Sequence, residues 1–140
     1  MARYFKYKSP EELIAEATAL GLELSLSADL SPLFQPIKIG QLTAGNRLVV
    51  QPMEGCDGTL DGRPDELTFR RYRRFGAGGA KLIWGEAASV VEEGRATNRQ
   101  LLVADHTAGD LERMLRECRQ AHREALGNED RKSTRLNSSH

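Results

Sequence analysis

The stretch RLVVQPM, residues 47–53, is a compact apolar run that contains β-branched residues and ends near a proline. Its length and composition are typical of a buried parallel strand. A second run of this kind, AKLIWGEAASVV, covers residues 80–91, and a helical pattern capped by Thr68 reaches Phe75 between the two runs. Strands that alternate with helices form βαβ units. The sequence therefore predicts an α/β fold with a parallel sheet.

The segment on the N-terminal side predicts a helix and a hairpin. Ser9 is placed as an N-cap, Pro10 stands at the first helical position, and Glu12 is placed to complete a capping box. Gly21 is a natural residue to end this helix. Residues 37–46 alternate apolar and polar side chains around a glycine break, which indicates a small hairpin.

The C-terminal side predicts one more helix and then a polar tail. Thr107 with Asp110 indicates a helix start, and apolar side chains recur at helical spacing up to Gly127. That apolar stripe consists of Leu111, Met114, Leu115, Cys118, Ala121, His122, Ala125 and Leu126. Residues 128–140 are polar and contain a single large apolar side chain, so they cannot complete a core. They resemble a read-through peptide, and a natural disordered tail is the alternative.

Composition narrows the class of protein. The chain has 140 residues, 20 Lys and Arg against 20 Asp and Glu, and an isoelectric point near 6.8. This balance argues against a dedicated nucleic-acid or membrane-surface binder, either of which needs a basic face. No apolar run approaches the ~20 residues that span a bilayer, and the N-terminus lacks a secretory signal. We expect a cytoplasmic protein with reduced cysteines.

Candidate polar groups lie where the two predicted strands end. Glu54 and Glu86 each end a strand, and Cys56 lies in the glycine-rich loop after the first. In parallel α/β folds this edge carries the functional loops. Either glutamate could therefore contact a ligand. For Glu86 the alternative is an ion pair with an arginine.

Other noticeable residues have structural interpretations. The glycines at 76, 78 and 79 close a helix and open a strand, which is the opposite of a phosphate-binding loop and indicates a C-cap and turn. The four arginines at 70, 71, 73 and 74 are expected on a solvated helix face, with an anion patch as the alternative. Cys118 is expected to be buried and inert. His106 and His122 have no partner at metal-ligand or catalytic spacing, so no metal site and no catalytic residue is predicted.

Four motifs together resemble the opening of the old yellow enzyme family of NADH:flavin oxidoreductases. They are PLFQPIKIG at 32–40, NRLVVQPM at 46–53, GAKLIWGEAASV at 79–90 and EGR at 93–95. The resemblance covers residues 32–127. It implies an FMN-binding (β/α)8 TIM barrel in which flavin reduced by NAD(P)H passes hydride to an activated alkene or a related small-molecule acceptor.

The resemblance also implies cofactor-binding residues. It places Pro52, Met53 and Glu54 against the flavin ring system and Ala87 near it, and it makes the hairpin the closure of the barrel bottom. Relatives commonly carry Thr, Cys or Gly where this chain has Glu54. A carboxylate could tune the flavin in the same way only when protonated, so that tuning role is in doubt here.

The resemblance predicts a domain organisation with most of the barrel missing. Residues 1–31 form a helical leader, 32–127 the N-terminal part of the barrel, and 128–140 a non-native or disordered tail. A complete barrel needs about 250 residues, so the chain holds about two of its eight βα units. We expect such a fragment neither to hold FMN tightly nor to turn over.

Two alternatives to the flavin enzyme remain open from the residues alone. One is part of a non-flavin (β/α)8 enzyme of an aldolase-like or phosphate-binding kind, which would share only the alternation of strands and helices. The other is a stand-alone interaction module that pairs its open strands with another chain.

Overall fold

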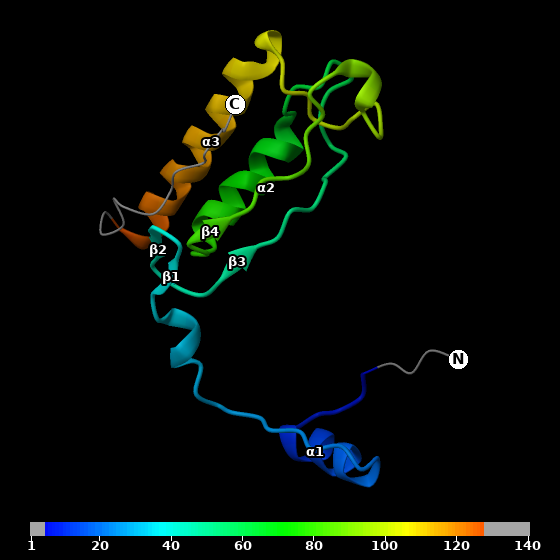
Figure 1. The fold of residues 1–140 in the computed structure, drawn as a ribbon, viewed down its shortest axis with the longest axis vertical. Coiled ribbons are helices and arrows are strands. Elements are labelled where there is room, and N and C mark those ends of the chain that lie inside the picture. Colours follow the sequence, from blue (N-terminus) through cyan, green and yellow to red (C-terminus); the bar gives the residue numbers. More distant parts are fainter. Residues whose placement is uncertain (1–4, 128–140) are drawn as a thin grey trace. The chain divides into compact units, whose positions relative to one another are not determined.

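A computed structural model describes residues 5–127, so the predicted tail at 128–140 lies outside the described residues. The chain divides into two compact units, Met1–Ser31 and Pro32–His140. In the first, the helix α1 spans Pro10–Ala19. The second contains all the strands and two longer helices (Figure 1). Within residues 5–127, no helix is both long and apolar enough to cross a bilayer.

Helix α1 begins where the sequence predicts. The Ser9 hydroxyl accepts a hydrogen bond from the Glu12 amide at 3.4 Å, and Pro10 is the first helical residue. The Glu12 carboxylate accepts from the Lys8 amide at 3.0 Å, one residue before the position that a capping box would use. Gly21 follows the helix with a positive φ of 70°, which favours glycine.

The predicted hairpin is present in the second unit, after a short 3-10 helix, η1, at Ser31–Phe34. Strand β1 (Ile37–Ile39) pairs antiparallel with β2 (Leu42–Ala44) across a turn at Gly40, which has a φ of 57°. Because the described strands form no closed barrel, the role of this hairpin in closing one stays a prediction.

The two apolar runs form the parallel pair that the sequence predicts. Strand β3 (Val49–Val50) pairs with β4 (Leu82–Ile83), and α2 (Glu66–Ala77) connects them as a βαβ unit. Asn46, which precedes β3, forms hydrogen bonds to the segment just before β4. Its amide donates to the Gly79 carbonyl at 2.9 Å and its oxygen accepts from the Lys81 amide at 3.2 Å.

Both strands are much shorter than the runs at 47–53 and 80–91, so the predicted strand lengths were wrong. The last ladder hydrogen bond runs from the Trp84 amide to the Val50 carbonyl at 2.9 Å. Beyond it, the two segments are joined through side chains instead of a continued ladder. The end of the second run pairs elsewhere. Ser89 forms a parallel bridge with Leu102, which follows in sequence. The apolar runs therefore predicted which segments form the strands but not the length over which they pair.

Helices α2 and α3 (Asp105–Leu126) lie side by side (Figure 1). Each starts earlier than the sequence predicts, because Thr68 and Thr107 occupy the third helical position and are not the caps. The Thr68 hydroxyl accepts from the amide of Asp65, and the Thr107 hydroxyl accepts from the amide of Ala104. Both threonines are fully buried. Asp110 pairs with Arg63 at 2.8 Å and does not cap the helix.

The core lies between these helices and the segments that follow β3 and β4. Its buried apolar side chains are Phe69, Tyr72, Leu101, Leu102 and Cys118. Cys118 is buried on α3 as the sequence predicts, and its burial raises the pKa of its thiol. By contrast, Trp84 remains 63% exposed and Val49 41% exposed. The strand pair thus leaves much of its apolar surface uncovered in this chain.

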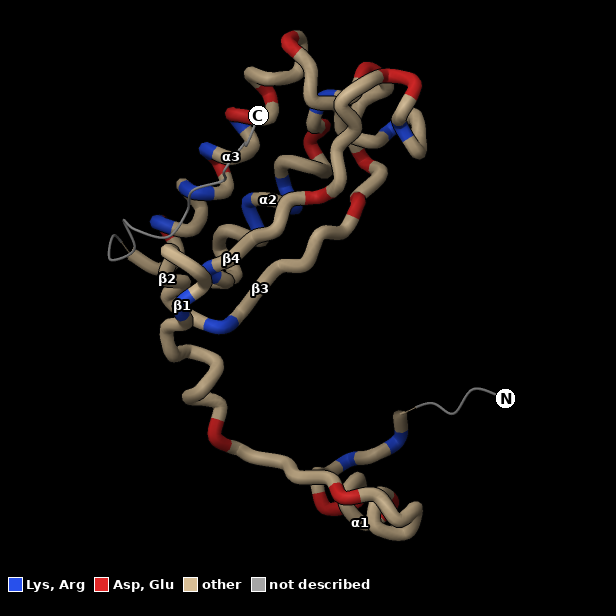
Figure 2. Tube along the Cα trace, in the orientation of Figure 1, with Lys and Arg blue, Asp and Glu red and all other residues tan. Residues whose placement is uncertain are grey.

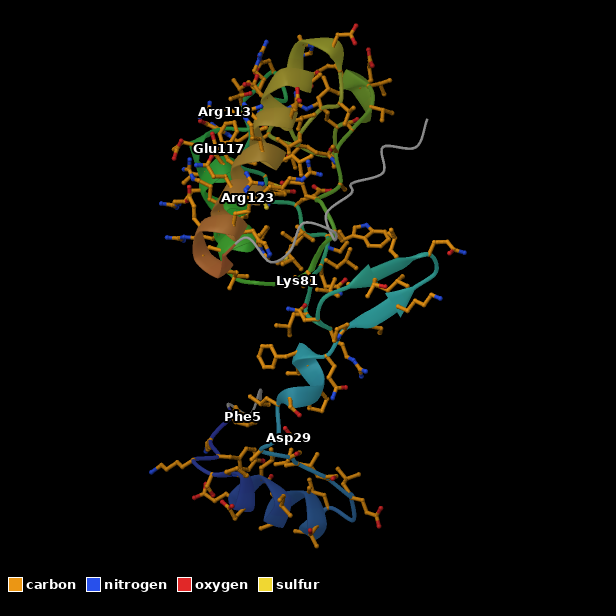
Figure 3. The ribbon with its side chains drawn as sticks, turned by 90° about the vertical axis from the view of Figure 1, so that its left-hand side faces the viewer. Phe5, Asp29, Lys81, Arg113, Glu117 and Arg123 are labelled. Atoms are coloured by element: carbon orange, nitrogen blue, oxygen red, sulfur yellow. The ribbon has the colours of Figure 1, made fainter. Side chains whose placement is uncertain are left out.

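Polar side chains also join α2 to α3. Arg73 on α2 donates to the Glu117 carboxylate at 3.0 Å, and Arg113 donates to the same carboxylate at 2.7 Å (Figure 3). The Arg113 guanidinium also stands over the Phe69 ring at 4.3 Å. These pairs stay partly exposed, so each contributes only a fraction of a kilocalorie, and the buried contacts carry most of the packing energy.

Candidate functional site

The ends of β3 and β4 bring the predicted cofactor-binding residues to one edge. Parallel strands present their carboxyl ends on the same side, so the segments after Val50 and Ile83 leave in the same direction. Pro52, Met53 and Glu54 follow β3, Ala87 follows β4, and all four are exposed. Met53 has 74% of its surface accessible.

Gln100 joins the two segments. Its side-chain nitrogen lies 3.4 Å from a Glu54 carboxylate oxygen and 3.3 Å from the Ala87 carbonyl. Its oxygen accepts from the Ala96 amide at 2.6 Å, which fixes the orientation of the amide group. Gln100 is buried, with 7% of its surface exposed. The sequence carried no signal for this contact, because the spacing within a loop does not show what the loop folds against.

An ion-paired cluster lies beneath the same edge. The Arg71 guanidinium on α2 contacts the carboxylates of Asp57 and Glu86, both at 2.8 Å. Figure 2 shows acidic positions in the loops after β3 and β4 near the basic positions of α2. The arginine partner suggested for Glu86 is therefore confirmed. The interpretation of all four arginines as a solvated face was wrong for Arg71, whose side chain is only 20% exposed.

The electrostatics of this cluster favour the charged form of Asp57. Burial opposes ionisation of Asp57, but hydrogen bonds from Arg71 and Thr68 outweigh it and leave the pKa of Asp57 below its ordinary value. Tyr72 lies beside the cluster, and its hydroxyl accepts from the Glu86 amide at 3.1 Å. Burial raises the pKa of Tyr72 to about 12, so its hydroxyl keeps its proton at neutral pH.

Arg95 organises the loops that surround Gln100. Its side chain is only 4% exposed and joins the segment at 59–60 to the segment at 92–100. The guanidinium donates to the carbonyls of Thr59, Leu60, Asn98 and Gln100 and to the carboxylate of Glu92. The sequence placed Arg95 only within a family motif and gave it no role.

The other noticeable residues have structural contacts. His122 Nδ1 lies 2.9 Å from the Gly76 carbonyl, and His106 Nε2 lies 3.1 Å from the Asp61 carbonyl. Gly79, with a φ of 83°, makes the turn that the sequence predicts, whereas Gly76 lies inside α2 and packs on α3. Cys56 is exposed and has a positive φ of 48°. In the described part of the chain, no group of His, Cys, Asp or Glu side chains is arranged to hold a metal ion.

Asp61 makes the stability of the loop at 59–63 sensitive to acid. The Thr59 hydroxyl and the Arg63 guanidinium lower the pKa of Asp61 from 3.8 to about 2. A carboxyl whose pKa is depressed in the folded state stabilises it above the unfolded pKa and loses that contribution as pH falls through the folded pKa. We expect the urea midpoint to fall between about pH 4 and pH 2, and Asp61→Asn to flatten part of that fall. Equal slopes for both proteins would contradict this assignment.

Comparison with known proteins identifies the fold. No protein-family model matches the chain. A crystal structure of TcOYE with pHBA is 22% identical with a TM-score of 0.57, and the match covers 66% of this chain and 25% of that one. An old yellow enzyme from a Pichia species is 22% identical with a TM-score of 0.57, and the match covers 65% of this chain and 24% of that one. For a variant of NCR from Zymomonas mobilis the identity is 27% and the TM-score 0.56, and the match covers 64% of this chain and 29% of that one.

These matches confirm the resemblance to old yellow enzymes at the level of the fold. The described α/β unit corresponds to part of a TIM barrel, as the sequence predicts. The chain spans about a quarter of the length of the structures that it matches.

Proposed function

We propose that this chain is the N-terminal part of an FMN-dependent NAD(P)H oxidoreductase of the old yellow enzyme family, of the ene-reductase or NADH oxidase type. The observation that carries the proposal is the convergence of two strand ends in a fold shared with old yellow enzymes. Gln100 holds Glu54 and Ala87 together at that edge. A small-molecule acceptor would be the substrate, and neither nucleic acid nor a membrane is a proposed partner.

The residues at this edge fit the ring system of FMN. Pro52 and Met53 offer exposed apolar surface after β3, and Ala87 offers a small exposed side chain after β4. These are the features that let a flat ring approach closely. We propose that these three residues, with Glu54, would hold one side of the flavin. Bound FMN would supply hydride transfer between the nicotinamide and the acceptor.

Arg71 and Arg95, which join the loops at this edge, are not placed to bind the phosphate of FMN. An arginine would be the natural partner for a phosphate. Arg71 already contacts two carboxylates, and Arg95 is buried and donates to loop carbonyls. Among the described residues, these two arginines therefore leave the ring contacts without the charge pairing that would anchor the cofactor. This division supports the proposal that the chain is inactive alone.

The position of Glu54 bears on how the flavin would be tuned. The carboxylate lies beside the Gln100 amide and is exposed to solvent. A charged carboxylate accepts hydrogen bonds and donates none. We propose that Glu54 helps to shape the edge of the site and does not replace the hydroxyl or thiol that relatives carry there.

We expect the purified chain to retain almost no FMN after desalting. Ring contacts alone should give an affinity in the millimolar range, equivalent to about −4 kcal/mol. The measurement is the flavin absorbance of the protein fraction after incubation with excess FMN. A free-FMN sample carried through the same column is the control. Stoichiometric flavin in the protein fraction would contradict the proposed inactivity of the isolated chain.

A further inference from the structure

Arg71 connects the segments that leave the two strands. It stands on α2, the helix that joins β3 to β4. Its Nη2 donates to Asp57, in the loop after β3, and to Glu86, just past the end of β4, both at 2.8 Å. Its Nε donates to the other oxygen of Asp57 at 3.2 Å. One side chain thus fixes two loops relative to the helix between them.

The loop after β3 is held on both sides of Cys56. On one side, the Gly55 amide donates to the second oxygen of Glu86 at 3.1 Å. On the other side, the Asp57 carboxylate accepts from the Thr68 hydroxyl at 2.7 Å as well as from Arg71. Gly55 is also close-packed, because a Cβ there would lie 2.1 Å from Arg71 Nη2.

The backbone between these anchors is in an unfavourable conformation. Cys56 has a φ of 48°, in the left-handed region, and is the one described residue other than glycine with a positive φ. For a residue with a Cβ, this region is disfavoured, so surrounding contacts must impose it. The anchors supplied by Arg71, Glu86 and Asp57 are the contacts adjacent to Cys56.

We propose that Arg71 is a positioning residue that sets the conformation of residues 54–57 by binding Asp57 and Glu86 together. That this also positions cofactor-binding residues rests on the proposed function. Glu54 stands three residues before Asp57, and Ala87 directly follows Glu86. The contacts that fix the loop are made within this chain, so its geometry can be tested without flavin.

The chemistry of the cluster explains why arginine occupies this position. A planar guanidinium can meet one carboxylate through two nitrogens and a second one at the same time, whereas an ammonium is a single point charge. The Glu86 side chain is only 4% exposed and contacts the Arg71 guanidinium at 2.8 Å. The Arg71 guanidinium also lies 5.3 Å from the centre of the Tyr72 ring, which holds it in place.

The test compares Arg71→Met with Arg73→Met in the full chain. Arg73 is a matched control because it also stands on α2 and joins two carboxylates, those of Glu66 and Glu117, away from the loop. We expect Arg71→Met to speed amide hydrogen exchange at Gly55 by about tenfold, and Arg73→Met to change it by less than about twofold. The reactivity of the buried Cys118 thiol is the control for global unfolding in both variants, because this thiol becomes reactive when the chain unfolds.

Glu86→Gln keeps the test decisive if Arg71→Met unfolds the chain. Glu86 uses one carboxylate oxygen for Arg71 and the other for the Gly55 amide. A glutamine has only one acceptor oxygen, so it must lose one of these bonds. We expect exchange at Gly55 to rise while Cys118 stays protected. Unchanged exchange at Gly55 with Cys118 protected, in this variant or in Arg71→Met, would overturn the proposal.

Arg71→Lys separates charge from mere bulk. Lysine retains the positive charge but not the fork, so we expect it to recover part of the protection of Gly55 that methionine loses. No recovery would overturn the electrostatic role assigned to Arg71. None of these measurements contains flavin, so a failure of the cofactor assignment leaves them unaffected, and a failure of the loop assignment is visible without it.

Discussion

Gly76→Ala is expected to lower the free energy of unfolding by about 3 kcal/mol, at the upper end of the range for overpacked sites. Gly76 lies in α2 where it meets α3, and a Cβ there would stand 2.1 Å from the carbonyl oxygen of Cys118. That oxygen belongs to the backbone of a 22-residue helix, so it cannot move aside as a side chain could. The two helices would have to separate, and Phe69 and Tyr72 would lose part of their burial.

Gly109→Ala is the matched control for this change. Gly109 also lies within a helix, but a Cβ there would meet nothing within 4 Å. The same substitution should therefore stabilise the protein by about 0.5–1 kcal/mol through helix propensity. Urea unfolding followed by circular dichroism measures both variants. Equal effects of the two substitutions would show that close packing at Gly76 does not govern the contact between α2 and α3.

Arg95→Met is expected to cost about 2–3 kcal/mol, because it removes the hydrogen bonds that a buried guanidinium makes to the backbone of two loops. The Arg95 side chain is 4% exposed, and four of its five hydrogen-bond acceptors are backbone carbonyls. The carbonyls of Thr59 and Gln100 are partly buried, so water can replace the lost donor there only in part. The loops at 59–60 and 92–100 should loosen together, and Gln100 should lose its fixed place beside Glu54 and Ala87.

Glu92→Gln separates the ion pair from the carbonyl contacts. Glu92 is 61% exposed and contacts Arg95 at 2.7 Å, so its charge should contribute less than about 1 kcal/mol. A large loss in Arg95→Met with little change in Glu92→Gln is the expected pattern in urea unfolding. If the two variants lost the same stability, the carbonyl contacts would not be the main role of Arg95.

Local signals in the sequence predicted helix α1, the hairpin and the order of strands and helices. Ser9 and Pro10 indicated the start of α1 because capping depends on residues only a few positions apart. The glycines at 40 and 79 indicated turns for the same reason, and both have positive φ. The threonines at 68 and 107 indicated helix starts, but their exact positions within the first turn needed the structure.

For the candidate site, the sequence determined which segments follow the two strand ends, and the tertiary structure decided what holds them there. Parallel strands put their ends on one side whatever their partners are, so Pro52, Met53, Glu54 and Ala87 could be placed from local patterns and a resemblance. The contacts of Arg71, Arg95 and Gln100 join segments far apart in the chain. A charged or amide side chain looks the same in sequence whether it is solvated or buried, because its desolvation and its partners depend on how distant segments pack.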